Sequence, residues 1–71
     1  MTNTPLLEKY IEKSGYKRSY IANVLGINSY TLSMKINNSS EFRASEIETL
    51  CELLNIDMEN RMSIFFAKKV D

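Results

Sequence analysis

Residues 18–32, RSYIANVLGINSYTL, decide the fold. Apolar side chains recur in this stretch at three- and four-residue spacing, and Gly26 interrupts them with a residue that readily takes positive φ. Ala22 is small at the point where two helices would cross closely. The stretch therefore predicts two short helices joined by a tight turn and held together at a steep angle by the apolar side chains of Ile21, Leu25, Ile27 and Leu32.

The same helical spacing continues on both sides of this stretch, and no segment alternates strictly enough for a half-buried strand. Thr4 is expected to cap a first helix before Pro5, and Gly15 to end it. Asp57 is expected to cap the last helix, which would run to about residue 67. The chain is thus predicted to be all-α, a compact bundle of about five short helices, with the middle three over residues 17–25, 28–35 and 44–54.

Residues 37–40, NNSS, form a polar stretch between the third and fourth expected helices. Asparagine is the best non-glycine residue for a left-handed position, so one is expected to take it here. If Arg43 caps the next helix, Phe42 and Ile47 have the spacing of a hydrophobic staple. Cys51 falls on the apolar stripe of that helix and is expected in the core.

Length and composition exclude several classes of function. A chain of 71 residues and 8.2 kDa holds one domain, over residues 1–71, with little room for a deep catalytic cleft. One cysteine and no histidine exclude an internal disulfide, a zinc site within one chain and histidine-based catalysis. We expect no enzyme activity, no cofactor and no metal. No segment has the length of a membrane span or the pattern of a secretory signal, so a cytoplasmic protein without membrane contact is expected.

Charge is balanced overall but unevenly distributed. Nine basic and nine acidic residues give a formal net charge of zero. Residues 1–43 carry six basic residues against three acidic ones, whereas residues 44–71 carry three against six. The first part, at +3, is the one expected to face phosphates, and the second part, at −3, to face something else.

With its flanking segments, the stretch at residues 18–32 resembles the helix-turn-helix of the lambda-repressor/Cro-like (XRE) family of bacterial and phage regulators. The resemblance covers residues 6–56 and implies a five-helix fold with the motif at about residues 17–37. In that family the second motif helix lies in the DNA major groove. The residues that the resemblance places at base edges are Asn28, Ser29, Tyr30, Ser33 and Met34. Hydroxyl groups there can donate or accept hydrogen bonds, and Met34 or the Tyr30 ring can pack on a thymine methyl.

Basic and polar residues beside the motif are expected to contact DNA phosphates, together with the free N–H groups of the two motif helices. These residues are Lys17, Arg18, Lys35, Asn37, Asn38, Ser39 and Arg43. The chain departs from the family pattern in having Lys17-Arg18 where glutamine or threonine is common and Asn38 where glycine is frequent. Its recognition helix also lacks glutamine and arginine, the residues that make bidentate base contacts.

The last segment, residues 57–71, has two interpretations. Phe65, Phe66 and Val70 either fold back into the core or form an apolar surface for a second copy of the chain. A homodimer would place two recognition helices on half-sites about 34 Å apart.

The function that these features favour is a sequence-specific regulator of the phage or prophage repressor type, which binds double-stranded DNA at an operator. The alternative is a protein-interaction module on the same fold, such as an anti-repressor or an antitoxin-like partner, because the net charge is zero and the recognition helix is weakly equipped.

Overall fold

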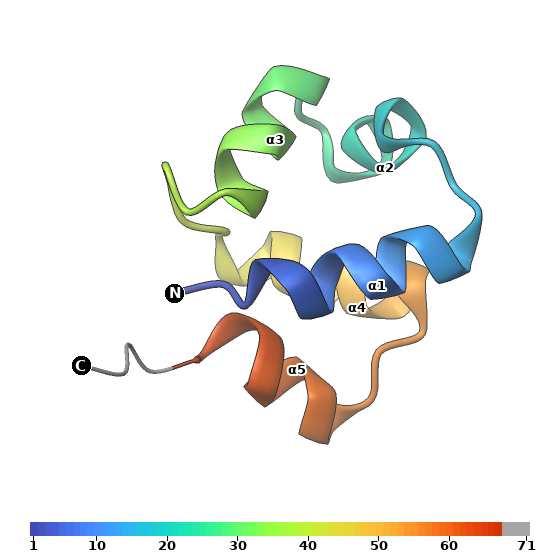
Figure 1. The fold of residues 1–71 in the computed structure, drawn as a ribbon. Helices are drawn as coiled ribbons and strands as arrows, with labels where there is room; N and C mark the ends of the chain where they lie inside the picture. Colours follow the sequence, from blue (N-terminus) through green and yellow to red (C-terminus); the bar gives the residue numbers. More distant parts are fainter. Residues whose placement is uncertain (68–71) are drawn as a thin grey trace.

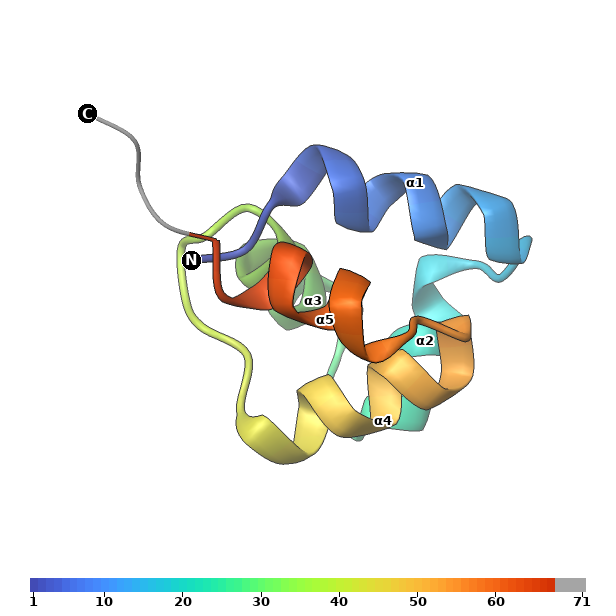
Figure 2. The same ribbon diagram turned by 90° about the horizontal axis from the view of Figure 1, so that it is seen from below.

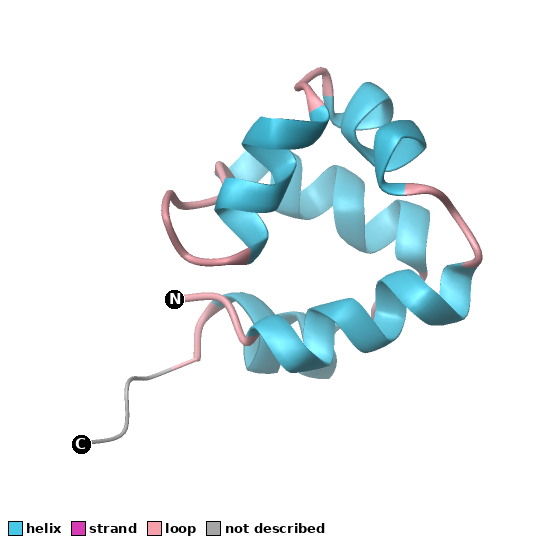
Figure 3. Ribbon diagram, turned by 45° about the horizontal axis from the view of Figure 1, so that its top comes forward, coloured by secondary structure: helices cyan, strands magenta, loops and turns pink. Residues whose placement is uncertain are grey.

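A computed structural model describes residues 1–67 and contains only helices and loops over that range (Figures 1 and 3). The five helices are α1 (Thr4–Ser14), α2 (Arg18–Leu25), α3 (Ser29–Ile36), α4 (Ala44–Leu54) and α5 (Met58–Phe65). The prediction of an all-α protein with five short helices is confirmed. The bounds differ from the expected ones by a residue or two, the range over which helix ends fray.

Side chains cap three of the five helices, including α3 at Asn28 and α5 at Asp57, the latter as predicted. Each of these two side chains accepts a hydrogen bond from the backbone N–H three residues later. The expected cap at Thr4 is wrong, because Asn3 caps α1 by accepting from the N–H of Leu6. Thr4 lies one position further in, where its hydroxyl is released to donate to the carbonyl of Ile36.

Left-handed residues end three of the helices. Gly15 and Gly26 both have φ of 75°, and Asn55, after α4, has φ of 56°. Asn38 also has positive φ, in the polar stretch after α3, which confirms the expectation of a left-handed asparagine there. At Gly26 the turn closes with Ile27 N donating to Ala22 O, and it redirects the chain from α2 into α3.

The helices form two sides around a shared core. In Figure 1, α2 and α3 lie above α1 and α4, and α5 lies below them. Viewed from below, α5 covers the centre of the molecule between α1 and α4 (Figure 2). Helix α2 packs on α3 and α4, whereas α1 packs on α4 and α5, so α4 links the two sides.

The core draws at least one fully buried residue from each helix. The largest fully buried side chains are Leu7, Ile21, Leu32, Ile36, Leu50 and Ile64. Leu25 and Ile27, expected as clamps between the motif helices, are only partly buried against this core, while Ala22 is fully enclosed. Cys51 is buried as expected. The clamp between α2 and α3 therefore rests mainly on Ile21, Leu32 and the close approach at Ala22.

No helix within residues 1–67 is both long and apolar enough to cross a membrane.

Candidate nucleic-acid interface

Helix α3 is buried along one side and exposed at its amino-terminal end. Leu32 and Ile36 are fully buried, four residues apart, and fix the inner face. Asn28, Ser29 and Tyr30 at the start of the helix are exposed, and 74% of Tyr30 is accessible to solvent. Because the exposed residues gather at the amino-terminal end, that end is the part of α3 that can meet a partner.

The five predicted base-contacting residues are therefore not equivalent. Ser29 and Tyr30 are exposed, whereas Ser33 and Met34, one turn later, are partly buried. The Oδ1 atom of Asn28 accepts from the backbone N–H of Thr31 at 2.7 Å, so this side chain has only its Nδ2 group left for a base. The side chains most available to a partner are those of Ser29 and Tyr30, and Met34 lies at the edge of this exposed region.

Lys35 does not belong to the predicted phosphate-binding set. It is buried in the last turn of α3, where Nζ pairs with Oε1 of Glu46 on α4, and the two side chains are only 9% and 8% exposed. An ammonium enclosed in this way cannot reach a phosphate without breaking the pair. The prediction for Lys35 is wrong because it rested on charge and sequence position, whereas the residue lies three positions after Leu32, on the inward stripe.

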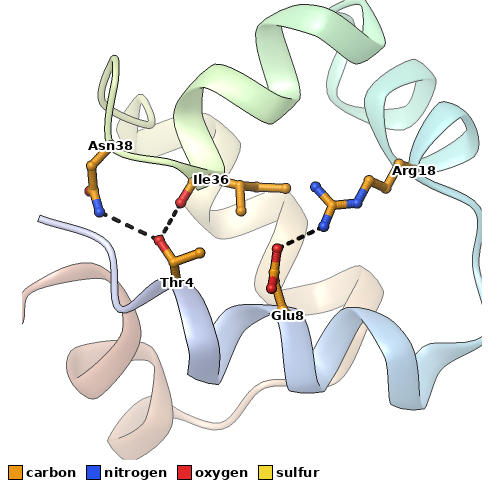
Figure 4. A network of polar contacts seen from close by, with 5 residues as sticks. All are labelled: Thr4, Glu8, Arg18, Ile36 and Asn38. Atoms are coloured by element: carbon orange, nitrogen blue, oxygen red, sulfur yellow. Dashed lines mark hydrogen bonds and ion pairs between the residues drawn. The ribbon is translucent and has the colours of Figure 1, made fainter.

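The other basic residues remain at the surface. Lys17 and Arg43 are exposed, and neither forms an ion pair within residues 1–67. Arg18 donates to Oε1 of Glu8 on α1 at 2.9 Å, and both side chains are largely open to water (Figure 4). An exposed pair of this kind contributes only about 0–1 kcal/mol, so a phosphate can compete for the guanidinium.

Polar groups of the loop after α3 form more hydrogen bonds within the protein than the sequence suggested. The side chain of Asn38 accepts from the N–H of Thr2 at 2.7 Å and donates to the carbonyl of Thr2 at 2.9 Å. Asn38 is therefore tied to the amino-terminal segment although the residue is exposed, and its phosphate contact stays a prediction. The N–H groups of Asn37 and Ser39 donate to carbonyls of α3, which leaves their exposed side chains as the groups that can face a phosphate.

Glu46, in the first turn of α4, is a residue of the site that the sequence did not single out. Burial by itself raises the pKa of this carboxyl group, but the hydrogen bonds from Lys35 Nζ and from the backbone N–H of Arg43 outweigh it and hold the pKa below its usual value. Arg43 caps α4, as predicted, with Phe42 before it and Ile47 at the fourth helical position. The carboxylate thus joins the start of α4 to the end of α3.

The three residues predicted to form a dimer contact, Phe65, Phe66 and Val70, differ in what the structure shows of them. Phe65 is 5% exposed and meets Phe42 edge to face, with ring centroids 5.5 Å apart, so it is a core residue and its assignment to a dimer contact is wrong. Phe66 is 56% exposed. Val70 lies outside the described residues. The core interpretation of the last segment holds for Phe65 only.

Nothing in the part of the chain that the structure describes resembles a metal site or an activated nucleophile. Residues 1–67 contain no group of three metal-ligating side chains. Burial raises the pKa of the Cys51 thiol, an effect that the charge of Arg61 reduces, so this cysteine stays protonated at neutral pH. A pocket of about 160 Å³ between the amino terminus and the end of α5 is lined in part by Met1, Phe42 and Phe66.

Over residues 1–67 the fold and this site define a small all-helical protein in which α3 presents an exposed amino-terminal end. Residues 3–68 match the family described as a protein of unknown function (DUF739). The chain therefore belongs to the DUF739 family. Comparisons with curated proteins and with solved structures found no match.

Proposed function

We propose that this protein is a sequence-specific DNA-binding transcriptional regulator that inserts α3 into the major groove. The observation that carries the proposal is the exposed amino-terminal end of α3, with Tyr30 74% accessible on a helix whose opposite face is fully buried. A major groove about 12 Å wide admits one α-helix, and an amino-terminal end carries free N–H groups that favour phosphate. The resemblance of residues 18–32 to the motif of phage repressors supports the same assignment.

The proposed contacts are assigned by exposure. Ser29 and Tyr30 would meet base edges, with Met34 at the border able to pack on a thymine methyl. Lys17 and Arg43 would bind phosphates, and Arg18 would do so by exchanging Glu8 for a phosphate oxygen. Since three cationic side chains supply the phosphate contacts of one chain, the logarithm of the binding constant should fall with the logarithm of salt with a slope no steeper than about −3 per chain.

By this proposal the protein would act as a repressor by occupying an operator, in the cytoplasm of a bacterial or phage-infected cell. Two copies of the chain on half-sites about 34 Å apart would add discrimination that one short helix lacks.

The test is selection of bound duplexes from a random DNA pool, followed by titration of the selected duplex and a scrambled one. Tyr30→Ala is expected to change the preferred sequence, because it removes a group placed at base edges. Lys17→Ala is expected to weaken binding to both duplexes and to reduce the salt slope by about 1. Ser63→Ala, a neutral change at an exposed residue of α5, serves as the control and should alter neither property.

If the selection enriches no sequence while the protein is folded, the DNA proposal is wrong. If Tyr30→Ala and Lys17→Ala have the same effect, the orientation proposed for α3 is wrong.

A second candidate function is a protein-interaction module, and one observation favours it. Met58, Met62 and Phe66 are more than half exposed and recur every four residues along and just beyond α5. An apolar stripe of this kind marks a protein contact more often than a nucleic-acid contact. Two results together would favour this function. The duplex selection would fail, and the folded protein would associate with itself or with a protein partner in a way that Met62→Asp abolishes.

A further inference from the structure

The carboxyl-terminal end of α3 is attached to three other parts of the chain by polar contacts. Thr4 of α1 donates to the carbonyl of Ile36, and Asn38 exchanges two hydrogen bonds with Thr2 (Figure 4 shows Thr4, Ile36 and Asn38). The third attachment is the pair between Lys35 and Glu46. The amino-terminal end of α3 has only its own cap, from Asn28. The carboxyl-terminal end of α3 is thus held by polar contacts, while its amino-terminal end is exposed to solvent.

Among these attachments, the pair between Lys35 and Glu46 is the one enclosed in the protein. Both side chains are more than nine-tenths buried. The same Oε1 atom of Glu46 accepts from the backbone N–H of Arg43, which fixes the carboxylate at the start of α4. The Lys35 ammonium therefore meets one defined point at the start of α4.

A buried ion pair is a poor source of stability, since apolar residues of similar volume often replace it without loss. What the pair adds is a fixed point of contact, because the ammonium must stay within hydrogen-bond distance of one carboxylate oxygen, whereas apolar contacts tolerate sliding and rotation. Direction matters in this helix because Tyr30 lies five residues before Lys35, about 7.5 Å along the axis. A swing of about 20° around the Lys35 end would move the Tyr30 end by about 2.5 Å, nearly a full hydrogen-bond length.

We propose that Lys35 and Glu46 are positioning residues that fix the direction of α3 against α4, so that its exposed end presents a single arrangement of side chains to DNA. This inference rests on the proposed function for its consequence at the DNA, but the direction of α3 is a property of the free protein. Neither residue touches the ligand. Both act through the placement of Ser29 and Tyr30.

The test replaces the pair with apolar residues in the double variant Lys35→Met, Glu46→Leu. Residual dipolar couplings of the α3 and α4 amides in the free protein measure the direction of α3, and titration with the selected and scrambled duplexes measures discrimination. The expected result is a folded variant whose α3 couplings no longer fit the wild-type direction, together with a loss of discrimination of about tenfold or more. Cys51→Ala is the control, because it creates a small cavity at a buried residue of α4 without removing a polar anchor.

The control should lose stability and keep both the α3 couplings and the discrimination. Unchanged α3 couplings in the double variant would overturn the inference, and so would changed couplings with unchanged discrimination. If the wild-type protein selects no duplex, the proposed function fails on its own, and the couplings alone decide the positioning role.

If the double variant does not fold, the double variant Lys35→Met, Glu46→Gln gives the same measurements, since it removes the ammonium while the amide oxygen still accepts from the Arg43 N–H. Altered α3 couplings in that variant support the inference, and wild-type couplings overturn it.

Discussion

Asn38 combines a left-handed backbone conformation, which glycine could also adopt, with a pair of side-chain hydrogen bonds, which neither glycine nor alanine could make. Its φ is 66°, in the left-handed region, and its amide group both donates to and accepts from the backbone of Thr2. Glycine tolerates the conformation but lacks the amide, and alanine lacks the amide and strains the backbone as well. Asparagine therefore suits this position for two reasons: it tolerates the left-handed conformation, and its amide binds the backbone of Thr2.

The prediction at this position is a graded loss of stability. Asn38→Gly should lower the free energy of unfolding by about 1 kcal/mol through the lost hydrogen bonds at a partly exposed site. Asn38→Ala should lower it by about 2 kcal/mol, because the left-handed strain is added. Urea denaturation followed by circular dichroism measures both. A wild-type free energy for Asn38→Gly would mean that the contacts with Thr2 contribute nothing.

At the scale of the elements, the turn between α2 and α3 sets the point at which the chain leaves α2 and enters α3. Gly26 has the same φ of 75° as Gly15, and a Cβ atom at either position would meet nothing within 4 Å. Alanine at either position is therefore penalised by backbone conformation alone. The two glycines differ in the helix that each one introduces, since Gly26 leads through the turn into α3 and Gly15 leads into α2.

This comparison gives a matched pair of variants. Gly15→Ala and Gly26→Ala should each lower the free energy of unfolding by about 1 kcal/mol, measured by thermal or urea denaturation. If the turn sets the placement of α3, only Gly26→Ala should also reduce binding to the selected duplex. Equal effects of the two variants on binding would show that the loss comes from stability and not from the turn.

At the scale of the whole molecule, the pair between Lys35 and Glu46 connects the charge state of one buried carboxyl group to the stability of the fold. The pKa of Glu46 is below its ordinary value in the folded protein, so the folded state binds this proton less tightly than the unfolded chain does. The group therefore stabilises the fold fully above the unfolded pKa, which is about 4.3. That stabilisation is lost as the pH falls through the folded pKa.

The contribution of Glu46 to the free energy of unfolding should accordingly be constant near neutral pH. It should fall on acidification below about pH 4.5. Urea denaturation at a series of pH values measures the effect. In the double variant Lys35→Met, Glu46→Leu, the acid-dependent loss should be smaller, because the titrating carboxyl group is gone. An identical acid dependence in the variant and the wild type would assign the loss to the exposed carboxylates instead.

The sequence predicted the elements better than it predicted the site. Helical spacing and cap residues indicated the five helices, the left-handed asparagine and the Phe42–Arg43–Ile47 arrangement, because each depends on neighbours a few residues away. Thr4 was misplaced as a cap because Asn3 and Thr4 are both good caps, and local sequence does not rank them. The exposure of Tyr30 could be predicted, because it lies two residues before Leu32 and so about 200° around the helix from it.

The sequence by itself determined that this protein is all-α, where its five helices lie to within a residue or two, and that α3 carries an exposed polar end, since these properties depend on backbone preferences and the period of the apolar residues. Only the tertiary structure decided that Lys35 is buried against Glu46, that Asn38 binds Thr2, and that Phe65 belongs to the core. These contacts join residues 11 to 36 positions apart, or different helices, so they exist only once packing has fixed the angles between helices.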